Sequence, residues 1–460
     1  MKALTSEQQH QKMVETPVTK LLITLSLPAI ITMLLSSIYN MADTYFVTSL
    51  GESAIGGVGV VFSIQYIIQA LGFGVAMGSS SLVSRKLGEK KNEEANIIAS
   101  SALTLGIGLG TLIALICITF LDKILLLIGA TDTILPYAKD YATIILCAAP
   151  VMCGSYVFGP LLRAEGKATL AMLVSLSGGV INFILDPIFI FTFKMGVMGA
   201  AAATAISQLI SFIVGVSFFL SGKSVVKLST KYTSNHFKVY WEILQTGAPT
   251  IFRQGLGAVA TTLLNVQMKV YGDAAVAAVS LANKVYVFIR AFVLGVGQGF
   301  QPIAGYNYGA KRLDRVKKVF VVATIFGSGV AILGTILCAC LPTQVMSLFG
   351  ATNQDVIMIG SRLLSMYAFA LPFLGFSSYV NMMYQALGHV KGAAFLASCR
   401  QGVFFIPLIL ILPMWLNRDG VLMAQPIADI LTFLISIPFC IWFIKSVLNN
   451  KTNNINQIAL

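Results

Sequence analysis

The sequence predicts an all-α polytopic membrane protein, with twelve transmembrane helices arranged as two parallel six-helix repeats. Composition is the first observation: 57% of the 460 residues are hydrophobic and only 11% are charged, whereas soluble proteins carry about 25% charged residues. The second is a series of long apolar stretches, and the third is an internal repeat. This composition excludes a soluble enzyme. The net charge of +13 does not indicate a nucleic-acid partner, because cytoplasmic loops of membrane proteins collect Lys and Arg.

A transmembrane helix needs roughly 20 apolar residues to cross the hydrocarbon core. Twelve stretches meet this requirement: 21–48, 54–83, 96–121, 135–159, 168–192, 196–221, 239–268, 275–303, 318–341, 357–384, 392–413 and 420–444. The loops on the side of the two termini hold 21 Lys and Arg, against 5 on the other side. Because positive loops stay inside, we expect a plasma-membrane protein with both termini in the cytoplasm.

An internal repeat appears when the sequence is shifted by 221 positions, since Pro28 then meets Pro249 and Gly88 meets Gly309. GVAMG at 74–78 also falls on GVGQG at 295–299. Six spans per repeat is an even number, so both repeats enter the membrane from the same side, and a binding site is expected between or within them. The predicted organisation is a tail, an N-lobe, a linker, a C-lobe and a second tail: 1–20, 21–221, 222–238, 239–444 and 445–460.

Two acids stand inside spans of the first half, where a carboxylate is costly unless it is paired, hydrated or functional. Asp43 lies at least six turns into the first span, with Tyr39 and Asn40 on the same helical face. Asp186 lies within NFILDP of the fifth span, with Asn182 one turn before it. Simpler interpretations are an acid at a helix end near water for Asp43 and a structural hydrogen-bonded acid for Asp186.

Thr204 of the sixth span should lie at a similar depth to these acids. Two carboxylates in a mostly apolar cavity resist ionisation, through desolvation and through mutual repulsion. One or both could therefore exchange a proton. The same oxygens of Asp43, Asn182, Asp186 and Thr204 could instead hold sodium, and the residues alone leave both alternatives open.

The second half carries basic residues within or near its spans instead, together with a single acid well inside a span, Asp429. A salt-bridged core and a role in transport are both compatible with this pattern. The basic residues are Arg253, Lys284, Arg290, Arg362 and Arg400.

The first span LSLPAIITMLLSSIYNMADTYFV, the loop SRKLGEKK and the fifth span NFILDPIFIF resemble multidrug and toxic compound extrusion (MATE) transporters, closest to the DinF-like branch with its MepA-type exporters. The resemblance covers about residues 15–447. It implies two V-shaped bundles that alternate between outward- and inward-facing states, and export of organic cations or amphipathic compounds against proton or sodium entry, with no cofactor and no enzymatic activity. The positions that match the ion-coupling residues of the family are Tyr39, Asn40, Asp43, Tyr141, Asn182, Asp186 and Thr204.

Two departures from the family pattern bear on the ion. Ser155 stands in the fourth span where some archaeal relatives carry Asn, and the seventh span lacks the Glu of sodium-coupled relatives. The resemblance thus favours an ion site in the first half.

A secondary-active multidrug antiporter, acting as a monomer on small amphipathic or cationic molecules in the bilayer, is the leading hypothesis. A flippase for lipid-linked oligosaccharides is the alternative, and the basic residues of the second half favour it. A receptor or scaffold is disfavoured, because the longest loop has only about 17 residues.

Overall fold

The computed structural model of the chain describes residues 5–48, 50–351 and 353–448. The side chains at 40–45, 47, 48, 52, 273, 447 and 448 lie outside the described part. Within these limits the described chain is built of helices joined by short turns. The helices of the first half are α1 (Ser6–Glu15), α2 (Val18–Thr48), α3 (Glu52–Gly88), α4 (Asn92–Thr119), α5 (Leu121–Leu127), α6 (Leu135–Ala164), α7 (Ala168–Pro187), η1 (Ile188–Thr192) and α8 (Gly196–Leu220).

After a linker that contains the short turn η2 (Thr230–Tyr232), the second half repeats the same order. Its helices are α9 (Phe237–Lys269), α10 (Asp273–Gly309), α11 (Leu313–Cys340), α12 (Pro342–Leu348), α13 (Gln354–Leu387), α14 (Val390–Ser398), η3 (Cys399–Phe405), α15 (Ile406–Phe443) and η4 (Ile444–Leu448). The twelve predicted spans agree with these helices to within a few residues at most ends. The short helices α5 and α12 were not predicted, because about seven residues carry no usable periodicity.

Ten helical segments of the described chain are long and apolar enough to cross a membrane. The last of them, Val390–Ser446, has 57 residues, which at 1.5 Å per residue is far longer than one crossing. Asn417 divides it, because its backbone angles (φ 50°, ψ −132°) are not helical, and the segment therefore crosses twice. The other crossing is α9, which is less apolar because it includes charged residues such as Glu242 and Arg253.

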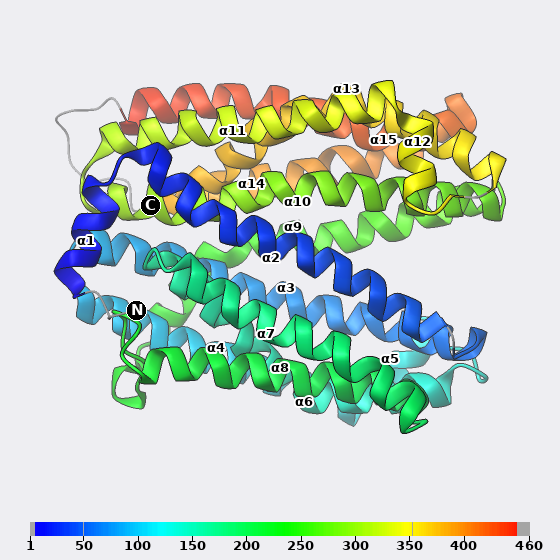
Figure 1. Cartoon of the computed structure of the whole chain (residues 1–460), viewed down its shortest axis with the longest axis horizontal. Helices are drawn as coiled ribbons and strands as arrows, with labels where there is room; N and C mark the ends of the chain where they lie inside the picture. Colours follow the sequence, from blue (N-terminus) through cyan, green and yellow to red (C-terminus); the bar gives the residue numbers. More distant parts are fainter. Residues whose placement is uncertain (1–4, 49, 352, 449–460) are drawn as a thin grey trace.

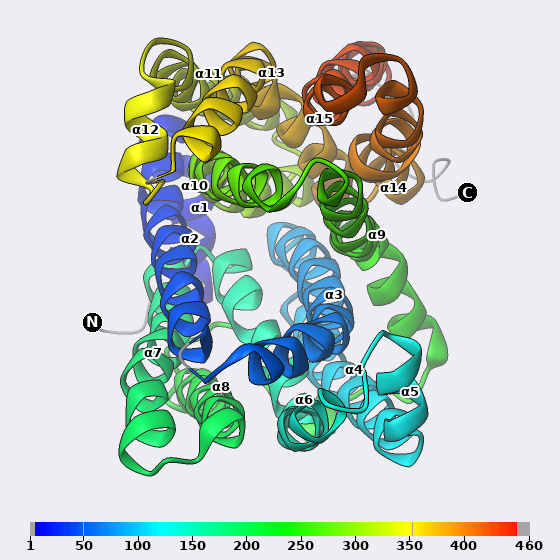
Figure 2. The same ribbon diagram turned by 90° about the vertical axis from the view of Figure 1, so that its right-hand side faces the viewer.

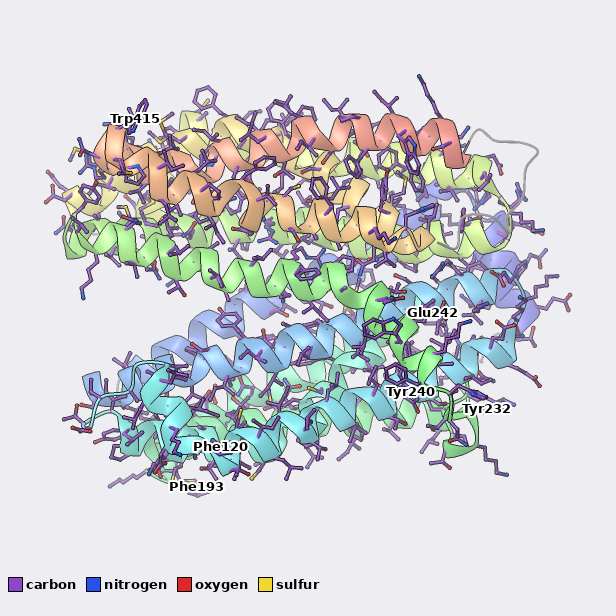
Figure 3. All side chains as sticks on the ribbon, turned by 180° about the vertical axis from the view of Figure 1, so that it is seen from behind. Phe120, Phe193, Tyr232, Tyr240, Glu242 and Trp415 are labelled. Carbon is purple, nitrogen blue, oxygen red and sulfur yellow. The ribbon has the colours of Figure 1, made fainter. Side chains whose placement is uncertain are left out.

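All the long helices run along one axis, and α1 lies at the end where both termini are found (Figure 1). We call this the terminal end and the other the distal end. Seen from the distal end, α10–α15 form one group and α3–α8 the other, with α2 passing from α10 toward α7 (Figure 2). Exposed aromatic rings occur at both ends: Phe120, Phe193 and Trp415 are labelled at the distal end (Figure 3), and Phe237 and Trp241 are exposed at the start of α9 near the terminal end.

The two halves meet through glycines in the terminal part of the bundle. The glycines that make these contacts occupy equivalent positions in the two repeats. A Cβ added to Gly78 of α3 would lie 2.2 Å from the carbonyl oxygen of Ile243 in α9. At the equivalent position, a Cβ on Gly299 of α10 would lie 2.7 Å from the backbone nitrogen of Ser26 in α2. Only glycine permits backbones to approach so closely. The halves are thus related by an approximate twofold axis along the bundle, and they are in close contact toward the terminal end.

Helix α1 was not predicted, because residues 1–20 show only a polar composition. It begins with a capping box, in which the Thr5 side chain and Gln8 each satisfy a backbone N–H of the other. Gln9 Nε2 donates to the carbonyl oxygen of Glu165 in the first half. His10 Nδ1 lies 3.2 Å from the hydroxyl of Tyr306 in the second half. The helix therefore bridges both halves across the terminal end.

The linker between the halves is hydrogen-bonded to the first half at several points, among them Asn96 of α4 and the buried acid Glu165. The carboxylate of Glu165 is fully buried and accepts hydrogen bonds from the backbone nitrogens of Val225 (2.8 Å) and Val226 (3.1 Å). Lys167 Nζ lies 3.1 Å from the same carboxylate. A buried carboxylate is stable only when hydrogen bonds or a counter-ion replace the water that it has lost. Because the linker backbone supplies two of these hydrogen bonds, Glu165 fastens the linker to the first half.

Candidate functional site

Asp186 is a buried carboxylate at the distal end of α7, and its side chain is only 1% exposed. Asn182, one helical turn earlier, donates from Nδ2 to Asp186 Oδ1 at 3.1 Å. The regular helix ends at Pro187, which cannot donate a backbone hydrogen bond, and the π-helical turn η1 follows. The sequence therefore places an ionisable group inside the bundle, next to a point where the helix changes its winding.

Helix α2 packs along α7 at this depth. The ring of Tyr39 covers Gly179, where an added Cβ would lie 2.4 Å from Tyr39 Cε1, and its hydroxyl donates to Ser36 Oγ at 2.9 Å. Further along, the rings of Phe46 and Phe183 are 6.1 Å apart. The helical backbone at positions 40 and 43 lies between these two contacts. The side chains of Asn40 and Asp43 are outside the described part of the chain.

Thr204 comes from α8, which runs antiparallel to α7. A Cβ on Gly178 would meet Ser211, and one on Gly199 would meet the backbone of Phe189. This register places Thr204 at the level between Asn182 and Asp186. The structure thus brings the backbones that carry four predicted positions, 39, 182, 186 and 204, to one region of the first half.

Tyr141 and Ser155 both lie on α6. The Tyr141 side chain is 2% exposed, and its hydroxyl accepts a hydrogen bond from Gln65 Nε2 at 3.3 Å. Ser155 Oγ donates to Gln208 Oε1 of α8 at 2.8 Å. These neutral pairs tie α6 to its neighbours, and neither Gln65 nor Gln208 was among the predicted site residues.

A charged network occupies the interior of the second half. Arg400 Nε lies 2.7 Å from Asp429 Oδ1, and the hydroxyl of Tyr286 donates to Asp429 Oδ2 at 2.8 Å. Gln425 Nε2 adds a bond to Asp429 Oδ1, also at 2.8 Å, and the Arg400 guanidinium donates to the Tyr286 hydroxyl. Asp429 is therefore fully engaged by Arg400 and neutral partners.

Arg253 and Arg290 line a cavity of about 40 Å³ beside this pair, together with Arg400 and Gln401. We call it the arginine pocket. Within the described chain, neither Arg253 nor Arg290 makes an ion pair. Two further basic residues considered from the sequence lie elsewhere: Lys284 is exposed and does not line the pocket, and Arg362 pairs with Asp419 at 2.6 Å at the distal end.

Sequence reasoning did not select Tyr286, Tyr367 or Gln425, although helical spacing offered a signal for two of them. Tyr286 precedes Arg290 by four residues and Gln425 precedes Asp429 by four, so each shares a helical face with a charged residue. The ring of Tyr367 packs against that of Tyr286 with centroids 4.7 Å apart and a tilt of 44°, and this contact between helices distant in sequence had no such signal.

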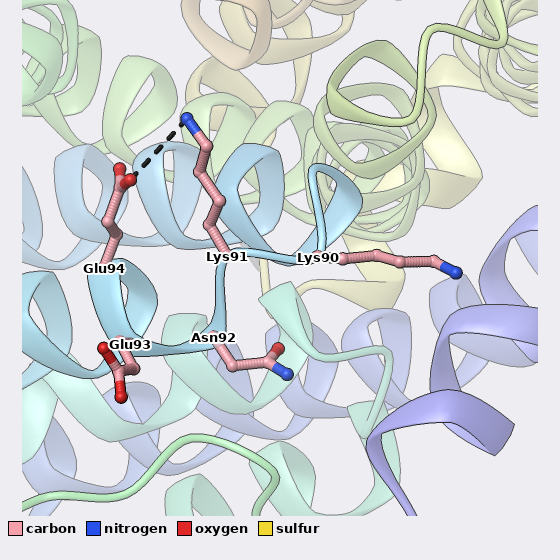
Figure 4. A pocket seen from close by; sticks show the side chains of 5 residues that line it. All are labelled: Lys90, Lys91, Asn92, Glu93 and Glu94. Atoms are coloured by element: carbon pink, nitrogen blue, oxygen red, sulfur yellow. Dashed lines mark ion pairs between the residues drawn. The ribbon is translucent and has the colours of Figure 1, made fainter.

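A surface hollow of about 420 Å³ lies at the turn between α3 and α4, lined by Lys90, Lys91, Asn92, Glu93 and Glu94 (Figure 4). Its charges neutralise one another, since Lys91 Nζ lies 3.6 Å from Glu94 Oε1. It lies at the terminal end, and none of its lining residues belongs to either buried network. Among the described residues, no group of three or more His, Cys, Asp or Glu is placed to hold a metal ion.

The family model MatE matches the chain twice, over residues 28–188 and 249–411. The two matches begin 221 residues apart, which is the offset of the internal repeat. The chain is also 28% identical to the multidrug export protein MepA of Staphylococcus aureus (strain MSSA476) over 422 residues, covering 91% of this chain and 93% of that protein. MepA of Staphylococcus haemolyticus (strain JCSC1435) is likewise 28% identical, with 90% and 91% covered.

Solved structures share the fold. A multidrug resistance MATE transporter of the MOP superfamily in an outward-facing conformation matches with a TM-score of 0.90 at 24% identity, over 97% of this chain and 99% of that one. A MOP superfamily transporter from Pyrococcus furiosus, described as having a binding pocket of reverse polarity, matches with a TM-score of 0.88 at 24% identity and the same coverage. The twelve-crossing architecture predicted from the sequence is thereby confirmed. With its two matched repeats and near full-length relatives, the chain belongs to the MatE family of multi-pass membrane transporters, and it is not an enzyme.

Proposed function

We propose that the protein is a secondary-active exporter of amphipathic, mainly cationic compounds, which it exchanges for protons or sodium ions across the plasma membrane. The observation that carries the proposal is Asp186, a carboxylate buried within a membrane-crossing bundle and hydrogen-bonded to Asn182. Such a group is costly in a membrane and marks ion or proton pathways. Multidrug export by the MepA relatives supports the substrate class.

The mechanism we propose is alternating access between two global states. The glycine contacts that join the halves lie toward the terminal end, and the excess of basic residues there supports a cytoplasmic location for that end. In this state the transporter is closed toward the cytoplasm. Binding of the coupling ion near Asp186 would shift the balance between states, and the coupling with substrate must then be reciprocal.

Residues of the first half form the proposed ion site. Asp186 and Asn182 supply the core of it, and Asp43, Asn40, Tyr39, Thr204 and Tyr141 are the further candidates. Protons would be carried by Asp186 with Asp43, whereas sodium would take oxygen ligands from Asp43, Asn182, Asp186 and Thr204.

Ethidium export from liposomes containing the purified protein tests this proposal, with an imposed proton gradient in one set and a sodium gradient in the other. We expect one of the two gradients to drive movement of ethidium across the liposome membrane. The variant Asp186→Asn should move ethidium at least tenfold more slowly than the wild type under that gradient. Asp132→Asn is the matched control, because Asp132 is exposed in the α5–α6 turn. Transport by Asp186→Asn at the wild-type rate would refute the role of this carboxylate.

Flipping of lipid-linked oligosaccharides is the second candidate function, and the arginine pocket is the observation that favours it. Arginine is suited to bidentate recognition of phosphate. If the protein flips such lipids, it should move a fluorescent polyprenyl diphosphate analogue across liposome membranes and leave ethidium where it is. The opposite result assigns the protein to drug export.

A further inference from the structure

The arginine pocket has an excess of positive charge in the middle of the membrane-crossing part. Arg253 lies near the centre of the 33-residue helix α9, and Arg290 near the centre of the 37-residue helix α10. With Arg400, three arginines line one small cavity. Of the six acids after residue 238, only Asp429 lies deep in a crossing, because the other five lie near helix ends: Glu242, Asp273, Asp314, Asp355 and Asp419.

Asp429 cannot neutralise more than one of these cations. Its Oδ1 accepts from Arg400 Nε and from Gln425, and its Oδ2 accepts from Tyr286. The distance from Arg400 Nε to Oδ1 is 2.7 Å, and the Asp429 side chain is only 3% exposed. Arg253 and Arg290 consequently retain two positive charges that no carboxylate of the described chain balances.

An uncompensated buried cation is expensive in a membrane protein and is retained for function. Arginine makes two parallel charge-assisted hydrogen bonds to a carboxylate or a phosphate. The cavity volume of about 40 Å³ exceeds the 10–15 Å³ that one water occupies, which is room for a small anionic group but not for a whole drug. Gln401 adds a buried Oε1 that has no hydrogen-bond partner among the described residues.

We propose that the arginine pocket is a binding subsite for the anionic group, a carboxylate or a phosphate, of an amphipathic molecule. Arg253 and Arg290 bind this group directly. Arg400 is a positioning residue, because Asp429 and Tyr286 already occupy its guanidinium, which also lies 5.6 Å from the centre of the Tyr286 ring. This proposal rests on the proposed transport function. It extends the substrates of that function from cations to zwitterions and anionic amphiphiles.

Two dyes that differ in one group provide the probe. Rhodamine 110 has a free carboxylate, and rhodamine 123 is its methyl ester, so the ring system and size are otherwise matched. Binding of each dye to the purified full-length protein is measured by fluorescence polarisation, with Arg253→Gln, Arg290→Gln and the double variant. Lys284→Gln is the control, because it removes one positive charge from the same helix as Arg290 but outside the pocket.

We expect the double variant to weaken rhodamine 110 binding about tenfold and rhodamine 123 binding less than twofold. The Lys284→Gln variant should bind both dyes like the wild type. Retained rhodamine 123 binding also shows that a variant is folded. Equal loss of both dyes in a protein that stays monodisperse on gel filtration, or no loss of rhodamine 110, would overturn the proposal.

Competition distinguishes the sources of the anionic group. If dihexanoyl phosphatidic acid displaces rhodamine 110 from the wild type and inorganic phosphate at the same concentration does not, the subsite takes a lipid headgroup. If neither displaces the dye, the subsite takes the carboxylate of an exported amphiphile. Gradient-driven transport of rhodamine 123 tests the export function separately. If no such transport occurs, the transport proposal fails. Arginine-dependent binding of rhodamine 110 would still establish the subsite.

Discussion

At the scale of single residues, two of the ion pairs of the second half lie in contrasting surroundings. The Arg400 and Asp429 side chains are 13% and 3% exposed, whereas those of Arg362 and Asp419 are 53% and 34% exposed. Removing one partner of a buried pair leaves an uncompensated charge and costs about 3–5 kcal/mol. An exposed pair contributes about 0–1 kcal/mol.

We therefore expect Asp429→Asn to lower the free energy of unfolding by about 3 kcal/mol, because Arg400 would join Arg253 and Arg290 as an unbalanced cation. Asp419→Asn should lower it by less than about 1 kcal/mol. Equilibrium unfolding in mixed detergent micelles measures both. Similar values for the two variants would mean that water reaches Asp429 freely.

The sequence could predict some contacts between site residues and not others. Asp186 and Asn182 were predictable together because their spacing of four places them on one helical face. The partner of Asp429 was not, since five basic residues were candidates and only the packing of η3 on α15 brings Arg400 to it. Asp43 stays a prediction.

At the scale of elements, the crossings were predictable and α1 was not. Apolar length alone locates a membrane helix, because the bilayer thickness sets the number of residues needed. No comparable length requirement applies to a polar ten-residue helix. Helix α1 is held by contacts with Glu165, Tyr306 and Asn307, which come from distant parts of the chain.

The docking of α1 should depend on pH through His10. Burial lowers the pKa of His10 from its ordinary value of 6.5, and nearby Lys90 acts in the same direction, opposed by a hydrogen bond to the backbone of Leu87 and by Glu15 and Glu7. The docked helix thus favours neutral His10, so the docking is strongest above about pH 6.5 and weakens as the pH falls through the lowered value.

Hydrogen exchange of residues 6–15 checks this expectation, after correction for the intrinsic pH dependence of exchange. Protection should fall between pH 7.5 and pH 5.5 in the wild type and change less in His10→Gln. His236→Gln, which alters an exposed histidine in the linker, should behave like the wild type. Constant protection in the wild type would show that His10 does not control docking.

At the scale of the whole molecule, the approximate twofold axis makes equivalent substitutions at the interface comparable. Gly78 and Gly299 are 221 positions apart and each approaches a backbone atom of the other half, Ile243 and Ser26 respectively. A larger side chain at either position must separate the halves toward the terminal end.

We expect Gly78→Val and Gly299→Val to reduce closure of that end by similar amounts, at least twofold. Cross-linking of cysteines introduced at positions 81 and 301 in a cysteine-free protein measures closure, since Gln301 Nε2 lies 3.4 Å from Ser81 Oγ across the interface. Gly108→Val is the control, because an added Cβ there meets nothing within 4 Å. Unchanged cross-linking in both test variants would contradict the role of the glycines.

The twofold relation of the halves has an evolutionary consequence. In a symmetric homodimer, both partners present the same surface patch at the interface. Two copies of a six-helix protein would form such an interface. In such a dimer every substitution would appear twice, a constraint that does not apply when the two copies are joined in one chain. At the sequence offset of 221, Arg253, Arg290 and Arg400 fall on Thr32, Gln69 and Gly179, while Asp186 falls on Pro407. A single chain can therefore carry the buried Asp186 in one half and the three arginines of the arginine pocket in the other, a difference that two identical subunits cannot have.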